Sequence, residues 1–210
     1  MSDCCGCDVD AKALQAEQRR VLKIVLAINI ATFFMVVAAA VYSGSSSLLS
    51  GGLDNFGDAL TYALSLAVVG STLAAKSRVA MLKGALILGA AIAVAIRIVW
   101  GVSNPAVPIV EAMSLACVLN LLANAICLRL LTPYRHGDVN LASAWECSRN
   151  DIYEGFAVFA AAGGVWLFRS PWPDLVVAVI LLVLFSRSAL RVFRAALTGL
   201  QEARAGGTPS

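Results

Sequence analysis

Charged side chains are scarce in this sequence, and their scarcity decides which solvent surrounds the protein. Asp, Glu, Lys and Arg make up 14% of its 210 residues, whereas 60% are hydrophobic. Soluble domains average about 25% charged and about 45–50% apolar residues. A single core of this size cannot hide the excess, because small domains keep much of their surface exposed. Lipid is therefore the expected solvent, and we expect no nucleic-acid partner. The net charge of +3 is small and says little by itself.

The sequence also has little histidine and no sign of a disulfide framework. The single histidine, His136, lies in a predicted loop, where we expect it to be solvated. A rhomboid-like serine protease would need a histidine base inside the membrane, so that class is excluded. The six cysteines form one tight cluster (Cys4, Cys5 and Cys7) and three isolated positions in apolar stretches, a spacing that does not suggest disulfide pairs. The first 20 residues also lack the pattern of a secretory signal peptide.

Long apolar runs are what the sequence has instead. A transmembrane helix needs about 20 mainly apolar residues. Six stretches qualify, at residues 23–42, 47–75, 81–100, 107–131, 141–168 and 173–197. Glycine, serine and proline separate them and act as helix breakers. We therefore expect an all-α membrane protein, a bundle of six transmembrane helices spanning residues 21–199, with cytoplasmic tails at 1–20 and 200–210.

Basic residues gather at alternate connections of this bundle. They precede the first run, separate the second from the third and the fourth from the fifth, and end the sixth: Lys12, Arg19, Arg20, Lys23, Lys76, Arg78, Lys83, Arg129, Arg135, Arg187, Arg191, Arg194 and Arg204. The remaining connections hold none, apart from Arg97 and Arg169 near helix ends. An excess of Lys and Arg marks the cytoplasmic side. Both termini are therefore predicted to be cytoplasmic.

Two of the runs carry candidate metal ligands. Ionisable residues inside a membrane are expensive and are functional by default. Asp54 and Asp58 lie one turn apart in the second run, and Cys147 and Asp151 lie one turn apart in the fifth. Three carboxylates and one thiolate suit tetrahedral zinc, and the thiolate favours softer ions such as cadmium. Hydrogen bonding between helices is the alternative interpretation, and two such pairs make it the weaker one.

The same ligands predict a role for protons. Without a cation, neighbouring carboxylates in a membrane would repel one another and hold protons. Metal binding would then release those protons, which gives a route to coupled exchange. Glu154 and Asn150 are candidates for an accessory metal or proton path, although Glu154 alone is also typical of a contact between helices.

Other polar residues have simpler interpretations. Arg149 falls on the opposite face of its helix from Cys147, so we expect it to contact another helix. Glu111 lies near a helix end, and we expect it at the membrane interface. Asn120 and Asn124 lie four residues apart, and we expect them to make packing hydrogen bonds between helices. We expect Cys117 and Cys127 to fill small apolar spaces in the core. The cluster of Cys4, Cys5 and Cys7 either captures metal at the cytoplasmic face or belongs to a tail whose thiols do nothing essential.

Two segments resemble the cation diffusion facilitator family of metal/proton antiporters. SLLSGGLDNFGDALTYALSL is similar to the family's second-helix motif, in which a His or Asp stands four residues before an Asp. DVNLASAWECSRND is similar to its fifth-helix start, which usually carries His-x-x-x-Asp. Asp54, Asp58 and Asp151 fill three of the four ligand positions, and Cys147 stands where the family usually has His.

The resemblance implies a six-helix homodimer that exports metal from the cytoplasm through a site at these four residues. The family's cytoplasmic C-terminal domain has no counterpart here, so we expect a short form. We expect efflux of zinc or cadmium, or else cobalt, nickel or mercury, in exchange for protons by alternating access, with no permanent cofactor, in a bacterial inner membrane. One alternative is a passive channel or uniporter. The other is an intramembrane aspartyl protease, which needs two aspartates on neighbouring helices. Asp58 and Asp151 could fill that role, but the glycine motifs of that protease family are missing.

Overall fold

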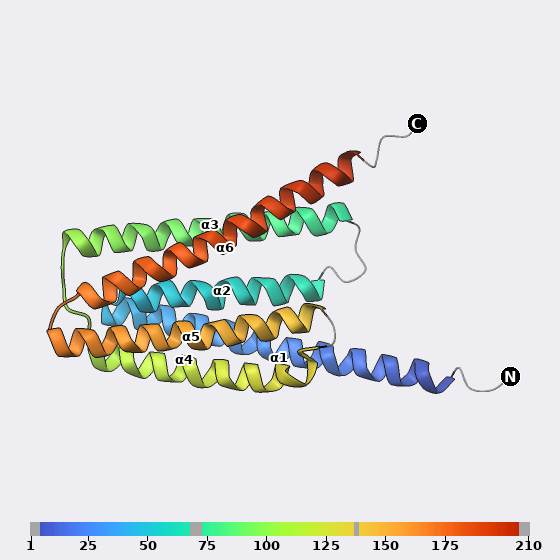
Figure 1. Cartoon of the computed structure of the whole chain (residues 1–210), viewed down its shortest axis with the longest axis horizontal. Helices are drawn as coiled ribbons and strands as arrows, with labels where there is room; N and C mark the ends of the chain where they lie inside the picture. Colours follow the sequence, from blue (N-terminus) through green and yellow to red (C-terminus); the bar gives the residue numbers. More distant parts are fainter. Residues whose placement is uncertain (1–4, 68–72, 137–138, 206–210) are drawn as a thin grey trace.

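Six α-helices account for most of the chain, as the apolar runs predict (Figure 1). The computed structural model describes residues 5–67, 73–136 and 139–205, and no strand occurs within these ranges. The helices are α1 (Cys5–Ser43), α2 (Ser46–Ala67), α3 (Leu73–Ser103), α4 (Val110–Leu131), α5 (Val139–Phe168) and α6 (Trp172–Ala205), with a 3-10 turn at Thr132–Tyr134. The prediction of an all-α bundle of six helices is confirmed.

Several helix ends differ from the predicted runs. α1 begins at Cys5 instead of residue 23, α3 at Leu73 instead of residue 81, and α6 ends at Ala205 instead of residue 197. The predicted second run, 47–75, was too long, because α2 ends at Ala67. Hydropathy marks only the part of a helix that suits lipid, whereas alanine, glutamine, glutamate and arginine continue a helix into polar surroundings.

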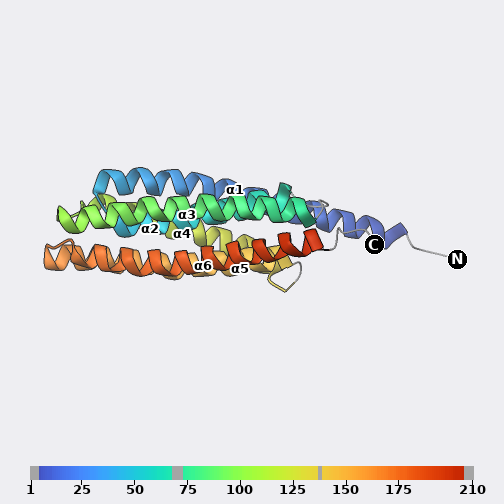
Figure 2. The same cartoon turned by 90° about the horizontal axis from the view of Figure 1, so that it is seen from above.

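α2 is the central helix of the bundle. It packs against α1, α3, α5 and α6. α3 and α6 lie along each other on one side, and α4 pairs with α5 on the other (Figures 1 and 2). Polar side chains on α2 therefore face other helices, and Asp58 is only 7% exposed.

Both ends of the described chain lie at the same end of the bundle. α1 begins and α6 ends there, and we call it the terminal end (Figure 1). The connections α1–α2, α3–α4 and α5–α6 lie at the opposite end, the far end. An even number of antiparallel crossings produces this arrangement.

The outer surface is apolar over much of its area. Large hydrophobic side chains such as Phe34, Ile96 and Trp166 are more than half exposed, which suits a lipid-facing surface. By length and composition, four helical stretches within the described residues could cross a membrane: Ala16–Ser43, Ala85–Ser103, Val110–Tyr134 and Ala144–Phe168. α2 falls outside this set because serine, glycine, asparagine and aspartate dilute its apolar residues. The side chains of α6 are described only in part beyond Arg187.

One carboxylate joins α6 to the start of α2 at the far end. Asp174 in the first turn of α6 is 1% exposed. Its Oδ1 accepts hydrogen bonds from the hydroxyls of Ser45 and Ser47, both at 2.6 Å. The backbone N–H groups of Ser46 and Ser47 donate to the same carboxylate at 2.7 and 3.1 Å. Because an α-helix begins with unsatisfied N–H groups, this Asp174 cap stabilises the start of α2.

The turn between α1 and α2 has its own local signals. Gly44 follows the last residue of α1 with φ of +75°, a conformation that glycine adopts at little cost. Ser45 caps α2, because its hydroxyl accepts the Leu48 N–H at 3.0 Å. Arg97 on α3 donates to the Gly44 carbonyl at 2.9 Å, close to the end of α1. Arg97 was an exception to the predicted clustering of basic residues on one side of the membrane. This hydrogen bond explains its position at the far end as a structural one.

Candidate metal centre

A cavity of about 400 Å³ brings the sequence-predicted ligands together. Asp54 and Asp58 line it from α2, and the side chains of α5 that line it include all four predicted there: Cys147, Asn150, Asp151 and Glu154. Leu184 and Phe185 of α6 complete the wall. Residues far apart in the sequence therefore share one polar space between three helices.

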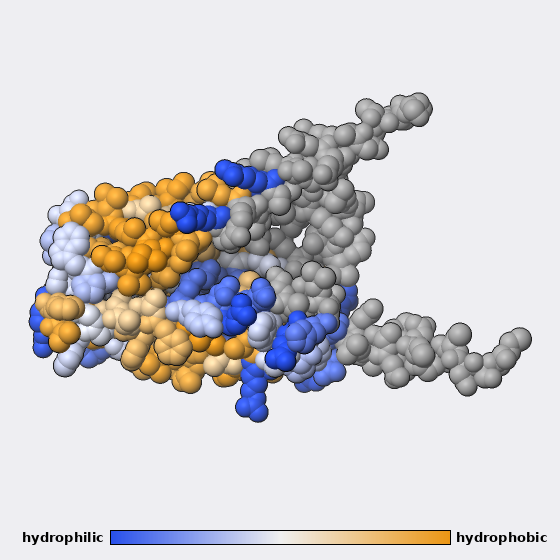
Figure 3. Space-filling view, viewed as in Figure 1, coloured by the Kyte–Doolittle hydropathy of each residue, from blue (hydrophilic) through white to orange (hydrophobic). Residues whose placement is uncertain are grey.

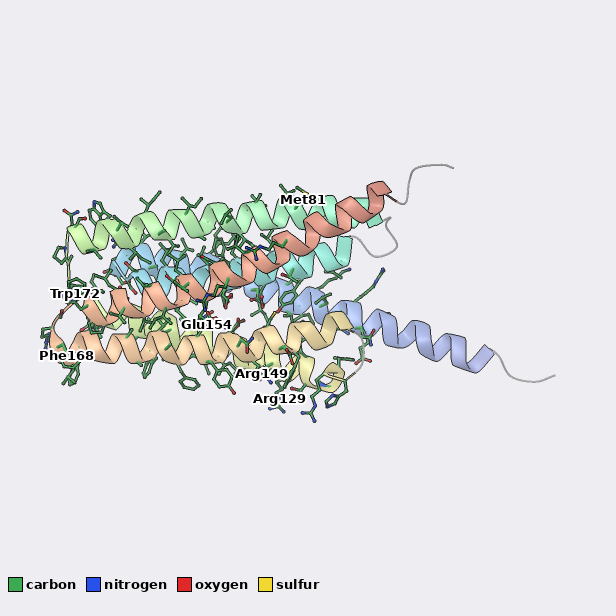
Figure 4. The ribbon with its side chains drawn as sticks, turned by 45° about the horizontal axis from the view of Figure 1, so that its top comes forward. Met81, Arg129, Arg149, Glu154, Phe168 and Trp172 are labelled. Carbon is green, nitrogen blue, oxygen red and sulfur yellow. The ribbon has the colours of Figure 1, made fainter. Side chains whose placement is uncertain are left out.

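Helical spacing explains why each helix presents its pair to the same space. Residues four apart lie on one face of a helix. α2 and α5 pack against each other, so the face of α2 with Asp54 and Asp58 meets the face of α5 with Cys147 and Asp151. Glu154 lies near the middle of the bundle, whereas Phe168 and Trp172 lie at its far end (Figure 4). The cavity is thus deep within the helical layer.

The cavity reaches the surface between α5 and α6. In the space-filling view, a hydrophilic area interrupts the apolar surface near the middle of the molecule (Figure 3). Asn150 and Tyr153 are exposed along this opening. Asp58 and Asp151, by contrast, are only 7% and 5% exposed. An ion could therefore approach the buried carboxylates from one side of the bundle.

Tyr62 is a site residue that the sequence interpretation missed. Its hydroxyl donates to Oδ2 of Asp58 at 2.6 Å. The side chain is 2% exposed and lies four residues after Asp58, on the same face of α2. That spacing, the same as between Asp54 and Asp58, was the signal that could have identified it. Tyr62 holds the carboxylate of Asp58 in one orientation.

The acidic side chains share the cavity without converging on one point. Asp54 lies close enough to Glu154 and Asp151 for electrostatic interaction, and Asp151 close enough to Asp58. Among the residues whose side chains are described, no three His, Cys, Asp or Glu form a group that could hold a metal ion as they stand.

The comparison with protein families decides which class of protein carries this cavity. Residues 22–200 match the model described as the cation efflux transmembrane domain. The chain belongs to this cation efflux family. A comparison with curated protein sequences found no match. The chain is therefore a multi-pass membrane transporter that exports metal cations and not an enzyme, and the aspartyl protease alternative is not supported.

The cation efflux domain also contains a much smaller polar space beside the cavity. This inner void measures about 10 Å³ and lies between α2, α4 and α5. Asp54, Asp151 and Glu154 border both spaces. Asn120 and Asn124 contribute from α4. The predicted packing hydrogen bond is confirmed for Asn120, whose Oδ1 accepts from Asn55 Nδ2 at 3.0 Å. It is wrong for Asn124, whose amide finds no partner among the described residues.

The remaining predicted residues of the cation efflux domain lie outside both spaces or at their edge. Arg149 stacks over Trp145 of its own helix, with 5.1 Å to the ring centroid, and among the described residues the expected interhelical contact is not observed. Cys117 and Cys127 are buried as expected, and the Cys117 thiol donates to the Gly155 carbonyl at 3.1 Å. His136 and Glu111 are exposed, as predicted. The side chains of Cys4, Cys5 and Cys7 lie outside the described residues.

Proposed function

We propose that this cation efflux protein exports a divalent transition-metal ion in exchange for protons. Zinc and cadmium are the favoured cargoes, and cobalt, nickel and mercury are less favoured. The observation that carries the proposal is the set of carboxylates and one thiol around a single cavity deep in the bundle. Carboxylate oxygen and thiolate sulfur bind zinc, and sulfur adds affinity for cadmium.

Protons are the counter-ion that fits this cavity. Three aspartates and one glutamate line it, and unpaired charges within a membrane are strongly disfavoured. Either a divalent cation or protons must neutralise them, and one site holds the two cargoes in alternation. Alternating access then requires the cavity to open on one side of the membrane when it holds metal and on the other when it holds protons.

The proposed orientation in the membrane rests on the placement of charge. Arg129 and Arg135 are exposed where α4 ends, at the terminal end, and basic residues mark the cytoplasmic side. The terminal end then faces the cytoplasm of a bacterial inner membrane, where Cys4, Cys5 and Cys7 could capture metal. A homodimer is the expected assembly.

Paired flux measurements test this function. The purified protein is placed in proteoliposomes with a metal-sensitive dye and a pH-sensitive dye. We expect zinc or cadmium to move in one direction and protons in the other, with neither flux in protein-free vesicles. Metal movement without proton movement would instead indicate a channel or uniporter. Absence of flux for all five metals would reject the proposal.

Replacing Cys147 by His should change which metal is preferred. Imidazole remains a good zinc ligand but is a poorer partner for cadmium than sulfur. In Cys147→His we expect retained transport and a cadmium-to-zinc rate ratio lowered about tenfold, equivalent to about 1.4 kcal/mol. Rates measured for both metals in the same vesicles check this.

Cys127→Ser is the matched control, because this thiol is buried on α4 and borders neither space. Its metal preference should equal that of the wild type. If Cys147→Ser transports both ions at wild-type rates, Cys147 is not a ligand.

A further inference from the structure

Three buried polar atoms beside the inner void have no hydrogen-bond partner among the described residues. Asn124 is 1% exposed, and neither its Oδ1 nor its Nδ2 hydrogen-bonds to a described residue. Oδ2 of Asp151 is in the same situation. Leaving one such group unsatisfied costs about 1–3 kcal/mol. Both side chains border the inner void, so a shared partner can satisfy them together.

The size of the void selects that partner. Its volume of about 10 Å³ is close to the about 10–15 Å³ that one water molecule needs. The rest of the wall is formed by apolar side chains and by four further polar ones: Val36, Leu48, Cys117 and Val158, and Asp54, Asn55, Asn120 and Glu154.

The hydrogen-bonding groups that lack a partner also match one water molecule. Water can donate to Asn124 Oδ1 and Asp151 Oδ2, and accept from Asn124 Nδ2. This gives three bonds, the typical number for a buried water. The hydrogen bond from Asn55 to Asn120 fixes the neighbouring amide and holds α2 against α4 beside the void.

We propose that Asn124 and Asp151 share one bound water molecule in the inner void, which makes Asn124 a positioning residue of the metal centre. The water engages one carboxylate oxygen of Asp151 on the α4 side. The second oxygen is thereby directed toward the cavity that holds the ion. α4 thus contributes to the site although none of its side chains lines that cavity. The effect on metal rests on the proposed function, whereas the water does not.

Hydroxyl-radical labelling of the metal-free protein tests the water. Radiolysis of a bound water oxidises the side chains that touch it. Val158 borders the void, and Val165 is an equally buried valine on the same helix that does not. We expect oxidation of Val158 above the level of Val165 in the wild type and no difference between them in Asn124→Leu. Equal oxidation of the two valines in the wild type would overturn the proposal.

Asn29→Leu is the matched control for this experiment. Asn29 is another fully buried asparagine, on α1, and it borders neither space. The contrast between Val158 and Val165 should persist in this variant. If the contrast also disappears in Asn29→Leu, then loss of any buried amide loosens the helix packing. In that case the assignment of the water to Asn124 is wrong.

Metal affinity tests the positioning role by calorimetry. Removing the outer partner of a metal ligand typically weakens binding about 10–100-fold, and we expect a loss in that range for Asn124→Leu. Asn124→Ser keeps a hydroxyl that can hold water and should restore affinity close to the wild type. An Asn124→Leu protein that binds metal as tightly as the wild type would overturn the role, as would a metal ion found on the Asn124 amide.

The two proposals fail in different ways. If the wild type neither binds nor moves metal, the proposed function is rejected, while the contrast between the valines still reports on the water. If metal transport is normal and the valines are oxidised equally, the inference about Asn124 is rejected alone.

Discussion

Asp151→Ala should abolish metal transport without unfolding the protein. Asp151 is 5% exposed, lines the cavity and interacts electrostatically with Asp54 and Asp58. Loss of an outer partner already weakens metal binding about 10–100-fold, so loss of a direct ligand should lower the transport rate at least about 100-fold. Because the substitution also relieves repulsion between carboxylates, the melting temperature should not fall. Vesicle flux and thermal unfolding measured on the same preparation check both parts.

Glu146→Ala is the matched control for this prediction. Glu146 is an exposed acid on the same helix, five residues earlier, and it does not line the cavity. Its variant should transport at the wild-type rate. Asp58→Ala should behave like Asp151→Ala, since Asp58 faces the same cavity from α2. Wild-type transport by either aspartate variant would remove that residue from the metal centre.

Asp174→Ala should cause the largest loss of stability among the substitutions considered. The Asp174 cap consists of four hydrogen bonds from two hydroxyls and two backbone N–H groups, at 2.6–3.1 Å. Hydrogen bonds to a charged group contribute about 1.5–3 kcal/mol each, and their donors would be left buried. Water can replace part of this, so we expect a loss of about 3 kcal/mol and a melting temperature lower by about 10 °C.

Glu111→Ala provides the comparison for the Asp174 cap. Glu111 is also an acid in the first turn of a helix at the far end, but it is exposed. Its interaction with the helix dipole is worth about 0.3–1 kcal/mol. Equal melting temperatures for the two variants would show that the Asp174 cap does not stabilise the start of α2.

Most of the fold could be predicted from the sequence because its signals are local. Each apolar run corresponds to one helix, and Gly44 and the prolines near residues 105, 133 and 171 end helices for steric reasons. The helix ends beyond the apolar runs could not be predicted, because α1, α3 and α6 continue where hydropathy gives no signal. Helix propensity decides those ends, and it is a weaker signal than burial in lipid.

The candidate site was predictable where its residues follow helical spacing and not where they depend on distant partners. The four-residue intervals place Asp54, Asp58, Cys147 and Asp151 around one cavity. Asp174 resembles any acid at the start of a helix, and its partners lie about 130 positions earlier in the chain. From the sequence alone, Asn124 is typical of a residue that packs between helices, and only the structure shows the void beside it. No local pattern encodes either contact.

The position of the Asp174 cap determines how far each part of α6 travels if that helix tilts. The cap fixes α6 to α2 near its first turn, so the rest of the helix acts as a lever arm. Leu184, on the cavity wall, lies about 15 Å beyond the cap, and the C-terminal end of α6 lies about 46 Å beyond it. A tilt of about 10° moves these points by about 3 Å and about 8 Å respectively. A modest swing therefore separates α6 from its neighbours more at the terminal end than near its first turn, where the four hydrogen bonds of Asp174 hold it to the start of α2.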